Sequence, residues 1–248
     1  MYPKSPYPKV SVVICALNEE KNLPQVLPYI PSWVDEVILM DGHSTDNTVM
    51  MAKKLRPDIK VLYQPNKGKG EALKYGVAAS KGDIIVTLDA DGTYSSEEMS
   101  LFIKAIMDGY DFAKGTRFIG KSPDCMPRNR QFGNKILAMT SNLLFRTNYT
   151  DICSGYYAFR KELFSQISLS SDGFELEQEL FVKIAKMKYK VVEVPHSYRR
   201  RQYGASKTRD FRQGIKDLLW IVSLFFSSQN RPSCINYVQN GNRLYEKT

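Results

Sequence analysis

Short apolar runs alternate with segments of helical composition through the first hundred residues of the chain. The runs, rich in β-branched residues, are residues 10–15, 36–40, 60–63 and 83–88. Helical segments lie between them: one around residues 23–30, one from a Ser44, Thr45 or Asp46 cap to about Arg56, and one over residues 71–80. Short strands that alternate with helices build a parallel sheet covered on both faces. The pattern predicts an α/β fold with a Rossmann-like, mainly parallel central sheet and helices on both faces.

Polar side chains follow these runs, where the strands are expected to end. Asn18 and Glu19 come after the first run, Asp41 after the second, and Asp89 with Asp91 after the fourth. Ligands of an open α/β sheet bind beyond the carboxyl ends of its strands, so these groups are expected to line one pocket. A helix cap or a turn is the alternative explanation for any single one of them.

Asp89 and Asp91 indicate a metal site. Two carboxylates that stand two residues apart beside a buried strand repel each other unless a cation neutralises them. Paired oxygen ligands are typical of Mg²⁺ or Mn²⁺ shared with phosphate oxygens. The sequence therefore predicts that Asp89 and Asp91 bind such a metal.

The charge of the chain is unevenly distributed. Residues 1–100 contain 11 Lys and Arg against 13 Asp and Glu, a net −2, whereas residues 101–248 contain 24 against 13, a net +11. A basic second half predicts an anionic partner, such as a phosphorylated substrate or an anionic membrane surface, with a solvated basic face as the alternative. Nucleic acid is not expected, because no recognisable nucleic-acid-binding module accompanies the basic half.

The composition is that of a globular cytoplasmic protein. Of the 248 residues, 43% are hydrophobic and 25% are charged, which suits a packed core and excludes disorder. No run approaches the roughly 20 apolar residues that span a bilayer, and no signal peptide is recognised. The four cysteines are scattered without a CxxC, so reduced thiols and a cytoplasmic location are expected rather than disulfides or a zinc site.

Eight segments follow one another in the order and spacing of a known family, over about residues 9–216. They are Cys15-Ala-Leu-Asn-Glu-Glu20, Asp41-Gly-His-Ser-Thr-Asp46, Lys67-Gly-Lys-Gly70, Asp89-Ala-Asp-Gly-Thr-Tyr94, Gly115-Thr-Arg117, Asp151-Ile-Cys-Ser-Gly-Tyr156, Phe174-Glu-Leu-Glu177, and Val194-Pro195 with the basic residues 199–207. This set resembles glycosyltransferase family 2, and within it the polyprenyl- and dolichyl-phosphate sugar synthases. A DxD pair alone is a weak signal, whereas eight ordered motifs together are specific.

The resemblance implies a GT-A-type single domain over residues 1–216. It implies an inverting transfer of a hexose from a GDP- or UDP-sugar to polyprenyl or dolichyl phosphate, with Mg²⁺ or Mn²⁺ as cofactor. The acceptor phosphate is already an anion and needs positive charge rather than a general base, and Arg117 and Arg130 match positions beside it. The catalytic positions carried over are Asp91, Arg117, Arg130 and Glu177. The nucleotide-sugar positions carried over are Ala16, Asn18, Glu19, Asp41, Lys69, Asp89, Ala90, Arg201 and Lys207.

The resemblance leaves alternatives open. Arg128 is an alternative to Arg130, because the local alignment there is ambiguous. If the acceptor is a hydroxyl of a soluble or cell-envelope glycan, Glu175 or Glu177 becomes the candidate base, and a solvated helix start is the alternative for both. Thr93 stands where several relatives have a glutamine, so water is expected to complete the metal shell. A catalytically silent nucleotide-sugar-binding protein is a further alternative, and the presence of both DxD acids argues against it.

Residues 209–228 are expected to form an amphipathic helix. Its last apolar stretch, residues 218–226, is too short to span a bilayer and suits a helix that lies in the membrane interface. Many relatives continue into transmembrane helices after this point, whereas here a polar tail, residues 229–248, follows. We therefore expect a peripheral protein on the cytosolic face of an anionic membrane. Packing on its own core, on a second subunit in a homo-oligomer, or on a membrane-anchoring partner are the alternatives.

Overall fold

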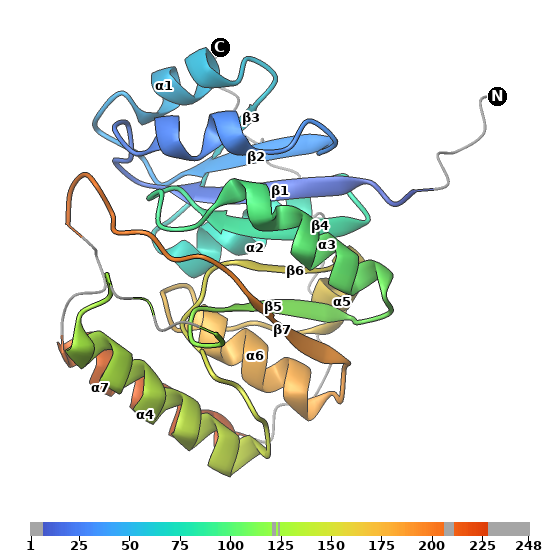
Figure 1. The fold of residues 1–248 in the computed structure, drawn as a ribbon, viewed down its shortest axis with the longest axis vertical. Helices are drawn as coiled ribbons and strands as arrows, with labels where there is room; N and C mark the ends of the chain where they lie inside the picture. Colours follow the sequence, from blue (N-terminus) through green and yellow to red (C-terminus); the bar gives the residue numbers. More distant parts are fainter. Residues whose placement is uncertain (1–6, 121–122, 124, 206–210, 228–248) are drawn as a thin grey trace.

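A computed structural model of the protein describes residues 7–120, 123, 125–205 and 211–227. Its centre is one seven-stranded sheet with the strand order β3-β2-β1-β4-β6-β5-β7 (Figure 1). The strands are β1 (Val10–Ala16), β2 (Glu36–Asp41), β3 (Lys60–Tyr63), β4 (Ile84–Asp89), β5 (Phe112–Thr116), β6 (Tyr157–Arg160) and β7 (Val191–Pro195). The helices are α1 (Thr48–Leu55), α2 (Lys69–Ala79), α3 (Met99–Met107), α4 (Arg128–Phe145), α5 (Lys161–Gln166), α6 (Leu176–Lys186) and α7 (Phe211–Phe226), with 3₁₀ turns η1 (Leu23–Gln25), η2 (Leu27–Tyr29) and η3 (Ser96–Glu98).

The first four strands form the parallel part of the sheet. β1 lies between β2 and β4, and β3 pairs with β2, all in parallel. β6 is antiparallel to both β4 and β5, and β7 is parallel to β5. All four strands expected from the apolar runs are present, so the predicted α/β fold with a mainly parallel sheet is confirmed.

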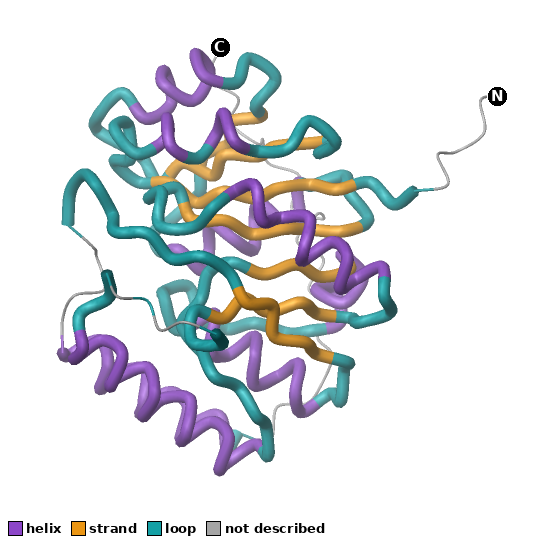
Figure 2. The backbone as a smooth tube through the Cα atoms, in the orientation of Figure 1, coloured by secondary structure: helices purple, strands orange, loops and turns teal. Residues whose placement is uncertain are grey.

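Helices cover both faces of the sheet (Figure 2). Successive side chains of a strand point to opposite faces, and β1 supplies core residues to both. Val12 and Ile14 pack with the core that includes α1 and α3, whereas Val13 packs with the core that includes α2 and α6. A strand buried on both sides has to be apolar throughout, which explains the uninterrupted apolar runs.

The helical stretch expected around residues 23–30 is present, but as 3₁₀ turns rather than as an α-helix. The chain makes the two 3₁₀ turns η1 and η2 there, each with a proline near its start. Pro24 and Pro28 lack the backbone N–H that the interior of an α-helix requires. The helix expected to follow residues 44–46 is α1, and the Asp46 carboxylate accepts a hydrogen bond from the Thr48 N–H at 3.0 Å. The cap explanation is therefore supported for Asp46.

α4 and α7 pack against each other and against α6, away from the central strands (Figure 1). The rings of Phe145 and Phe225 meet at this contact, with centroids 6.0 Å apart. α7 falls within the segment predicted to be an amphipathic helix, whereas the predicted polar tail lies outside the described residues. No helix in the described part of the chain is long and apolar enough to cross a membrane.

Candidate active site

A lysine joins three elements at the carboxyl edge of the sheet. Lys69 begins α2, and its Nζ lies 2.7 Å from Asp89 Oδ1 at the end of β4 and 2.7 Å from Glu177 Oε1 in the first turn of α6. Burial alone would lower the pKa of Lys69, but the two carboxylates raise it well above its usual value. Glu177 is only 7% exposed, so a solvated helix start is the wrong explanation for it.

Glycines bring the backbone close to this cluster. A Cβ on Gly155 would lie 2.7 Å from Asp89 Oδ2 and 2.8 Å from Lys69 Nζ, so the bare backbone there makes room for the ion pair. Gly68 has a φ of +119°, and a Cβ on it would overlap the Asp172 carbonyl. The Gly70 N–H donates to the same carbonyl at 2.8 Å. Gly68 and Gly70, on either side of Lys69, therefore let the start of α2 approach the loop that leads into α6.

Asp91 occupies a second cluster beside the first. Its Oδ1 accepts hydrogen bonds from the Thr93 N–H at 3.0 Å and from the Thr93 hydroxyl at 2.7 Å. Arg201 Nη1 lies 3.5 Å from Asp91 Oδ2, and Arg201 Nη2 lies 2.7 Å from Glu19 Oε2. Burial, and then the neighbouring Asp89, raises the pKa of Asp91. Thr93 therefore orients the second acid of the DxD pair.

Residues 196–203, which we call the strap, cross the DxD segment after β7. Tyr198 forms an antiparallel bridge with Tyr94, and the Arg199 N–H donates to the Thr93 carbonyl at 2.8 Å. Further along, the Tyr203 carbonyl accepts a hydrogen bond from the Asn22 amide at 3.1 Å. These contacts hold Arg201 beside Glu19 and Asp91, both of which are 110 or more residues away from Arg201 in the sequence. Lys207, predicted to bind the donor, lies outside the described residues.

The loops after β1 and β2 meet at the same edge. Ala16 and Asp41 are paired at the ends of their strands. Asn18 adopts a left-handed backbone with a φ of +56°, and its Oδ1 accepts a hydrogen bond from the Thr45 N–H at 2.7 Å. The buried Asp41 carboxylate accepts hydrogen bonds from the Ser44 N–H and hydroxyl at 2.9 and 2.6 Å. Contact of these residues, and of the buried Ala90, with a nucleotide stays a prediction.

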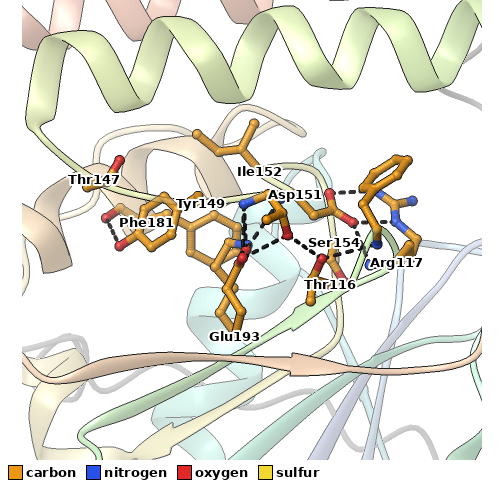
Figure 3. A network of polar contacts seen from close by, with 12 residues as sticks. Thr116, Arg117, Thr147, Tyr149, Asp151, Ile152, Ser154, Phe181 and Glu193 are labelled. Atoms are coloured by element: carbon orange, nitrogen blue, oxygen red, sulfur yellow. Dashed lines mark hydrogen bonds and ion pairs between the residues drawn. The ribbon is translucent and has the colours of Figure 1, made fainter. Parts of the chain in front are cut away.

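Arg117 follows β5 and is held by a buried acid (Figure 3). Its Nε and Nη2 donate to the two carboxylate oxygens of Asp151 at 2.6 and 2.8 Å. Burial would raise the pKa of Asp151, but the Arg117 guanidinium holds it well below its usual range. Asp151 belongs to one of the segments of the family resemblance but is 34 residues away from Arg117, so no local pattern in the sequence predicts this pair.

The charges of two arginines act on the pKa of Tyr198, a tyrosine of the strap. Burial raises the pKa of Tyr198, while the charges of Arg130 and Arg117 lower it and that of Asp91 raises it. The Arg117 guanidinium lies 5.4 Å from the Tyr198 ring centre. Arg117 also lowers the pKa of Glu177, although burial raises that pKa first. Arg117 thus lies beside the strap and Arg130 stands in the first turn of α4, while contact of Arg117, Arg130 or Arg128 with an acceptor stays a prediction.

The two DxD acids fit a divalent cation in their chemistry. Asp89 Oδ1 pairs with Lys69, Asp91 Oδ1 accepts from Thr93, and Asp91 Oδ2 lies 3.5 Å from Arg201 Nη1, so a cation held by both acids would share Asp91 with Arg201 or displace it. Within residues 7–120, 123, 125–205 and 211–227, no three His, Cys, Asp or Glu side chains form a metal-binding group. Two carboxylates suit Mg²⁺ or Mn²⁺ that takes its other ligands from phosphate and water.

Known proteins share both the sequence and the fold of this chain. The dolichyl-phosphate hexose transferase of Haloferax volcanii is 34% identical over 208 residues, which cover 83% of this chain and 89% of the relative. Glycosyltransferase AglJ of the same organism is 32% identical over 81% of this chain and 66% of its own length. The dolichol-phosphate mannosyltransferase of Pyrococcus furiosus is 32% identical over 81% of this chain, which spans 59% of that relative.

Solved structures and a family model complete the comparison. The glucosyl-3-phosphoglycerate synthase of Mycobacterium tuberculosis, crystallised with Mn²⁺, UDP and phosphoglyceric acid, is 21% identical, with a TM-score of 0.70 over 88% of this chain and 78% of that one. The same enzyme was also crystallised with Mg²⁺ and UDP. The model of glycosyl transferase family 2 matches residues 11–168, which confirms the resemblance of the motifs. The chain belongs to glycosyl transferase family 2, and its fold is that of the GT-A glycosyltransferases.

Proposed function

We propose that this protein is an inverting enzyme that transfers a hexose from a GDP- or UDP-sugar to polyprenyl or dolichyl phosphate. The names of the Haloferax and Pyrococcus relatives support a lipid-phosphate acceptor. The observation that carries the proposal is the place of Arg117, whose guanidinium lies 5.4 Å from the ring centre of Tyr198 on the strap that also holds Arg201 beside Asp91. Positive charge at this place suits an anionic acceptor next to the donor.

The reaction needs one displacement. An oxygen of the acceptor phosphate forms a bond to the anomeric carbon, and the bond from that carbon to the donor diphosphate breaks. The nucleoside diphosphate leaves with the bonding electron pair, and no proton has to be removed from the acceptor. Arg117 and Arg130 hold the attacking phosphate, while Arg201 on the strap faces the leaving diphosphate.

A divalent cation belongs to the donor half of this proposal. Asp89 and Asp91 would hold Mg²⁺ or Mn²⁺, which supplies positive charge to the leaving diphosphate when it is bound. Lys69 keeps Asp89 in place, and Thr93 does the same for Asp91. Glu19 holds Arg201 over the same edge of the sheet.

A hydroxyl acceptor is the second candidate, and one observation favours it. Burial and the neighbouring Asp89 raise the pKa of Glu177, as a general base requires. In that reaction the proton of the acceptor hydroxyl passes to Glu177 as its oxygen attacks. Glu177 already forms an ion pair with Lys69, and the charge of Arg117 also lowers the pKa of Glu177. Transfer to a neutral hydroxyl would not need these two cations.

We also propose that α4 and α7 lie on the cytosolic surface of an anionic membrane. Exposed apolar side chains recur at helical spacing on α4, namely Phe132, Ile136, Met139 and Leu143, and α7 adds Ile215, Leu219 and Phe226. Arg130 stands in the first turn of the helix that carries the α4 stripe. One helix therefore connects the proposed phosphate site to the proposed lipid surface. An apolar face with nearby basic residues suits an interfacial helix.

The proposal is tested with purified protein, Mn²⁺ and polyprenyl phosphate in detergent or vesicles. Each of several radiolabelled GDP- and UDP-sugars is added in turn, and the organic phase is counted. The proposal expects one sugar nucleotide to label the lipid, with loss of labelling in EDTA. Labelling of a soluble glycan in place of the lipid would support the hydroxyl alternative, and binding of every donor without turnover would indicate a silent binding protein.

A further inference from the structure

A fully buried lysine lies on β5, the strand next to the edge strand β7. Lys114 of β5 is in register with Glu193 of β7, and its Nζ lies 2.7 Å from Glu193 Oε1. Lys114 is 0% exposed, and the same ammonium lies 5.0 Å from the Tyr149 ring centre and 5.1 Å from that of Phe181. A buried ion pair costs desolvation energy that apolar side chains would avoid, so this pair calls for an explanation beyond packing.

Glu193 holds a turn of the backbone as well as the lysine. Its Oε2 accepts hydrogen bonds from the Thr150 N–H at 2.9 Å and the Thr150 hydroxyl at 2.7 Å. Its Oε1 accepts a third from the Asp151 N–H at 3.3 Å. Figure 3 shows the carboxylate of Glu193 below this turn and Arg117 on the other side of Asp151. Glu193 thereby fixes residues 150–151 through both backbone and side chain.

The turn that Glu193 holds is the one that orients Arg117. Asp151 contacts both Nε and Nη2 of Arg117, so a movement of the turn changes the plane of the guanidinium. Lys114 is also among the charges that lower the pKa of Asp151, after Arg117 itself. The chain of contacts runs from Lys114 to Glu193, through the turn to Asp151, and on to Arg117.

We infer that Lys114 and Glu193 are positioning residues for the acceptor: through Asp151, they set the orientation in which the Arg117 fork meets the acceptor phosphate. This inference rests on the proposed function for the role of the phosphate. A planar fork binds phosphate oxygens at fixed angles, so a small rotation weakens two contacts at once. Nothing in this chain of contacts involves the donor cluster of Lys69 and Asp89.

The test separates positioning from stability with two variants. Glu193→Gln keeps the side-chain shape but removes the charge. The double variant Lys114→Met with Glu193→Leu replaces the ion pair by apolar groups of similar size, a change that is often neutral or stabilising in other proteins. Glu179→Gln is the matched control, because Glu179 is a buried carboxylate that also holds a lysine and a turn, at residues 170–171.

Both Glu193 variants, once shown to be folded by circular dichroism, are expected to raise the KM for polyprenyl phosphate or lower kcat by about ten- to a hundredfold. The Kd of the sugar nucleotide should stay within twofold of wild type. Glu179→Gln should leave the acceptor KM unchanged. A folded double variant with wild-type acceptor kinetics would overturn the inference, because the pair would then serve stability alone.

A second measurement does not depend on the acceptor. In ¹⁵N-labelled protein, the Nε–H of Arg117 gives an NMR signal that is assigned by its loss in Arg117→Lys. Its hydrogen bond to Asp151 should slow solvent exchange in the wild type, and Glu193→Gln should speed that exchange or shift the signal. If wild type fails to use polyprenyl phosphate but the Glu193 variants still change the signal, the proposed function is wrong, whereas the positioning of Arg117 through Glu193 and Asp151 is confirmed. An unchanged signal in both Glu193 variants would show that Glu193 does not position Arg117.

Discussion

The donor side and the acceptor side of the site hold their charges in different ways. The side chains of Lys69, Asp89 and Asp91 are between 21% and 23% exposed, and each pairs across the edge of the sheet. The side chains of Arg117 and Asp151 are 5% and 0% exposed and form a two-bonded pair. Ion pairs that solvent reaches are weak and exchange partners easily, whereas a sealed pair is costly to break.

This difference has a functional meaning. In the proposed reaction, a metal and a diphosphate would displace Lys69 or Arg201 from some of their contacts with Asp89 and Asp91, which the partial exposure permits. The acceptor phosphate would instead meet an arginine whose orientation is already set by Asp151. We therefore expect substitutions on the donor side to change metal-linked nucleotide binding and substitutions on the acceptor side to change acceptor use.

The largest effect is expected from Asp91→Asn. The amide removes the negative charge that a divalent cation needs, so turnover should fall by about a thousandfold, as it does when an electrostatic contact to the transition state is lost. Thermal stabilisation by sugar nucleotide with Mn²⁺ should disappear, while circular dichroism stays that of the wild type. Wild-type turnover in the variant would remove Asp91 from the metal site.

Arg117→Lys tests the acceptor side. The guanidinium makes two parallel hydrogen bonds to Asp151 and still has N–H groups for a phosphate, which an ammonium cannot reproduce. We therefore expect about a hundredfold loss in kcat/KM for the lipid acceptor. Isothermal titration with the sugar nucleotide should give a Kd close to that of the wild type. Equal losses in donor and acceptor binding would break the division between the two sides.

Gly155→Ala perturbs the donor cluster without touching a charged residue. The new Cβ would lie within 3 Å of Lys69 Nζ and both carboxylate oxygens of Asp89, so the ion pair has to move. We expect the Kd of the sugar nucleotide in Mn²⁺ to rise about tenfold, with a loss of about 1–3 kcal/mol in unfolding free energy from overpacking. Gly133→Ala on α4 is the control: a Cβ there meets nothing within 4 Å, so donor binding should not change. A wild-type Kd in Gly155→Ala would show that Lys69 and Asp89 do not shape the donor site.

The smallest effect is expected at the proposed membrane face. Leu143→Ser with Phe226→Ser removes two of its most exposed apolar side chains, which are 82% and 79% exposed. Binding to phosphatidylglycerol vesicles in a sedimentation assay should weaken by about tenfold, or about 1.4 kcal/mol, because the two side chains insert only partly and each contributes a fraction of the roughly 1.5–3 kcal/mol of full burial. Met50→Ser on α1 should leave binding unchanged. If wild type ignores these vesicles even at low salt, where charges are least screened, the membrane face is excluded.

The sequence predicts the two sides of the site unequally, and the reason is local. Asp89, Asp91 and Lys69 follow or precede elements with clear periodicity, so their meeting at the edge of a parallel sheet could be expected. The hydrogen bonds of Asp151 to Arg117 and of Glu193 to the turn depend on the pairing of β5 with β6 and with β7. This pairing joins residues that are far apart in the chain. The helical stretch at residues 23–29 is 3₁₀ rather than α-helical because Pro24 and Pro28 lack the backbone N–H that an α-helix interior requires. The burial of Glu177 required the position of α6 relative to α2, which no local pattern contains.

A comparison of two acceptors distinguishes the proposed transfer to a lipid phosphate from a transfer to a hydroxyl. Purified protein receives its sugar nucleotide and Mn²⁺ together with either a polyprenyl phosphate or the polyprenol of the same chain length, and the lipid-linked hexose is measured. We expect product with the phosphate and none with the alcohol, because the proposed role of Arg117 and Arg130 is to hold an anionic acceptor, which requires no base. Equal or greater product with the alcohol would contradict this expectation and would assign Glu177 the role of general base.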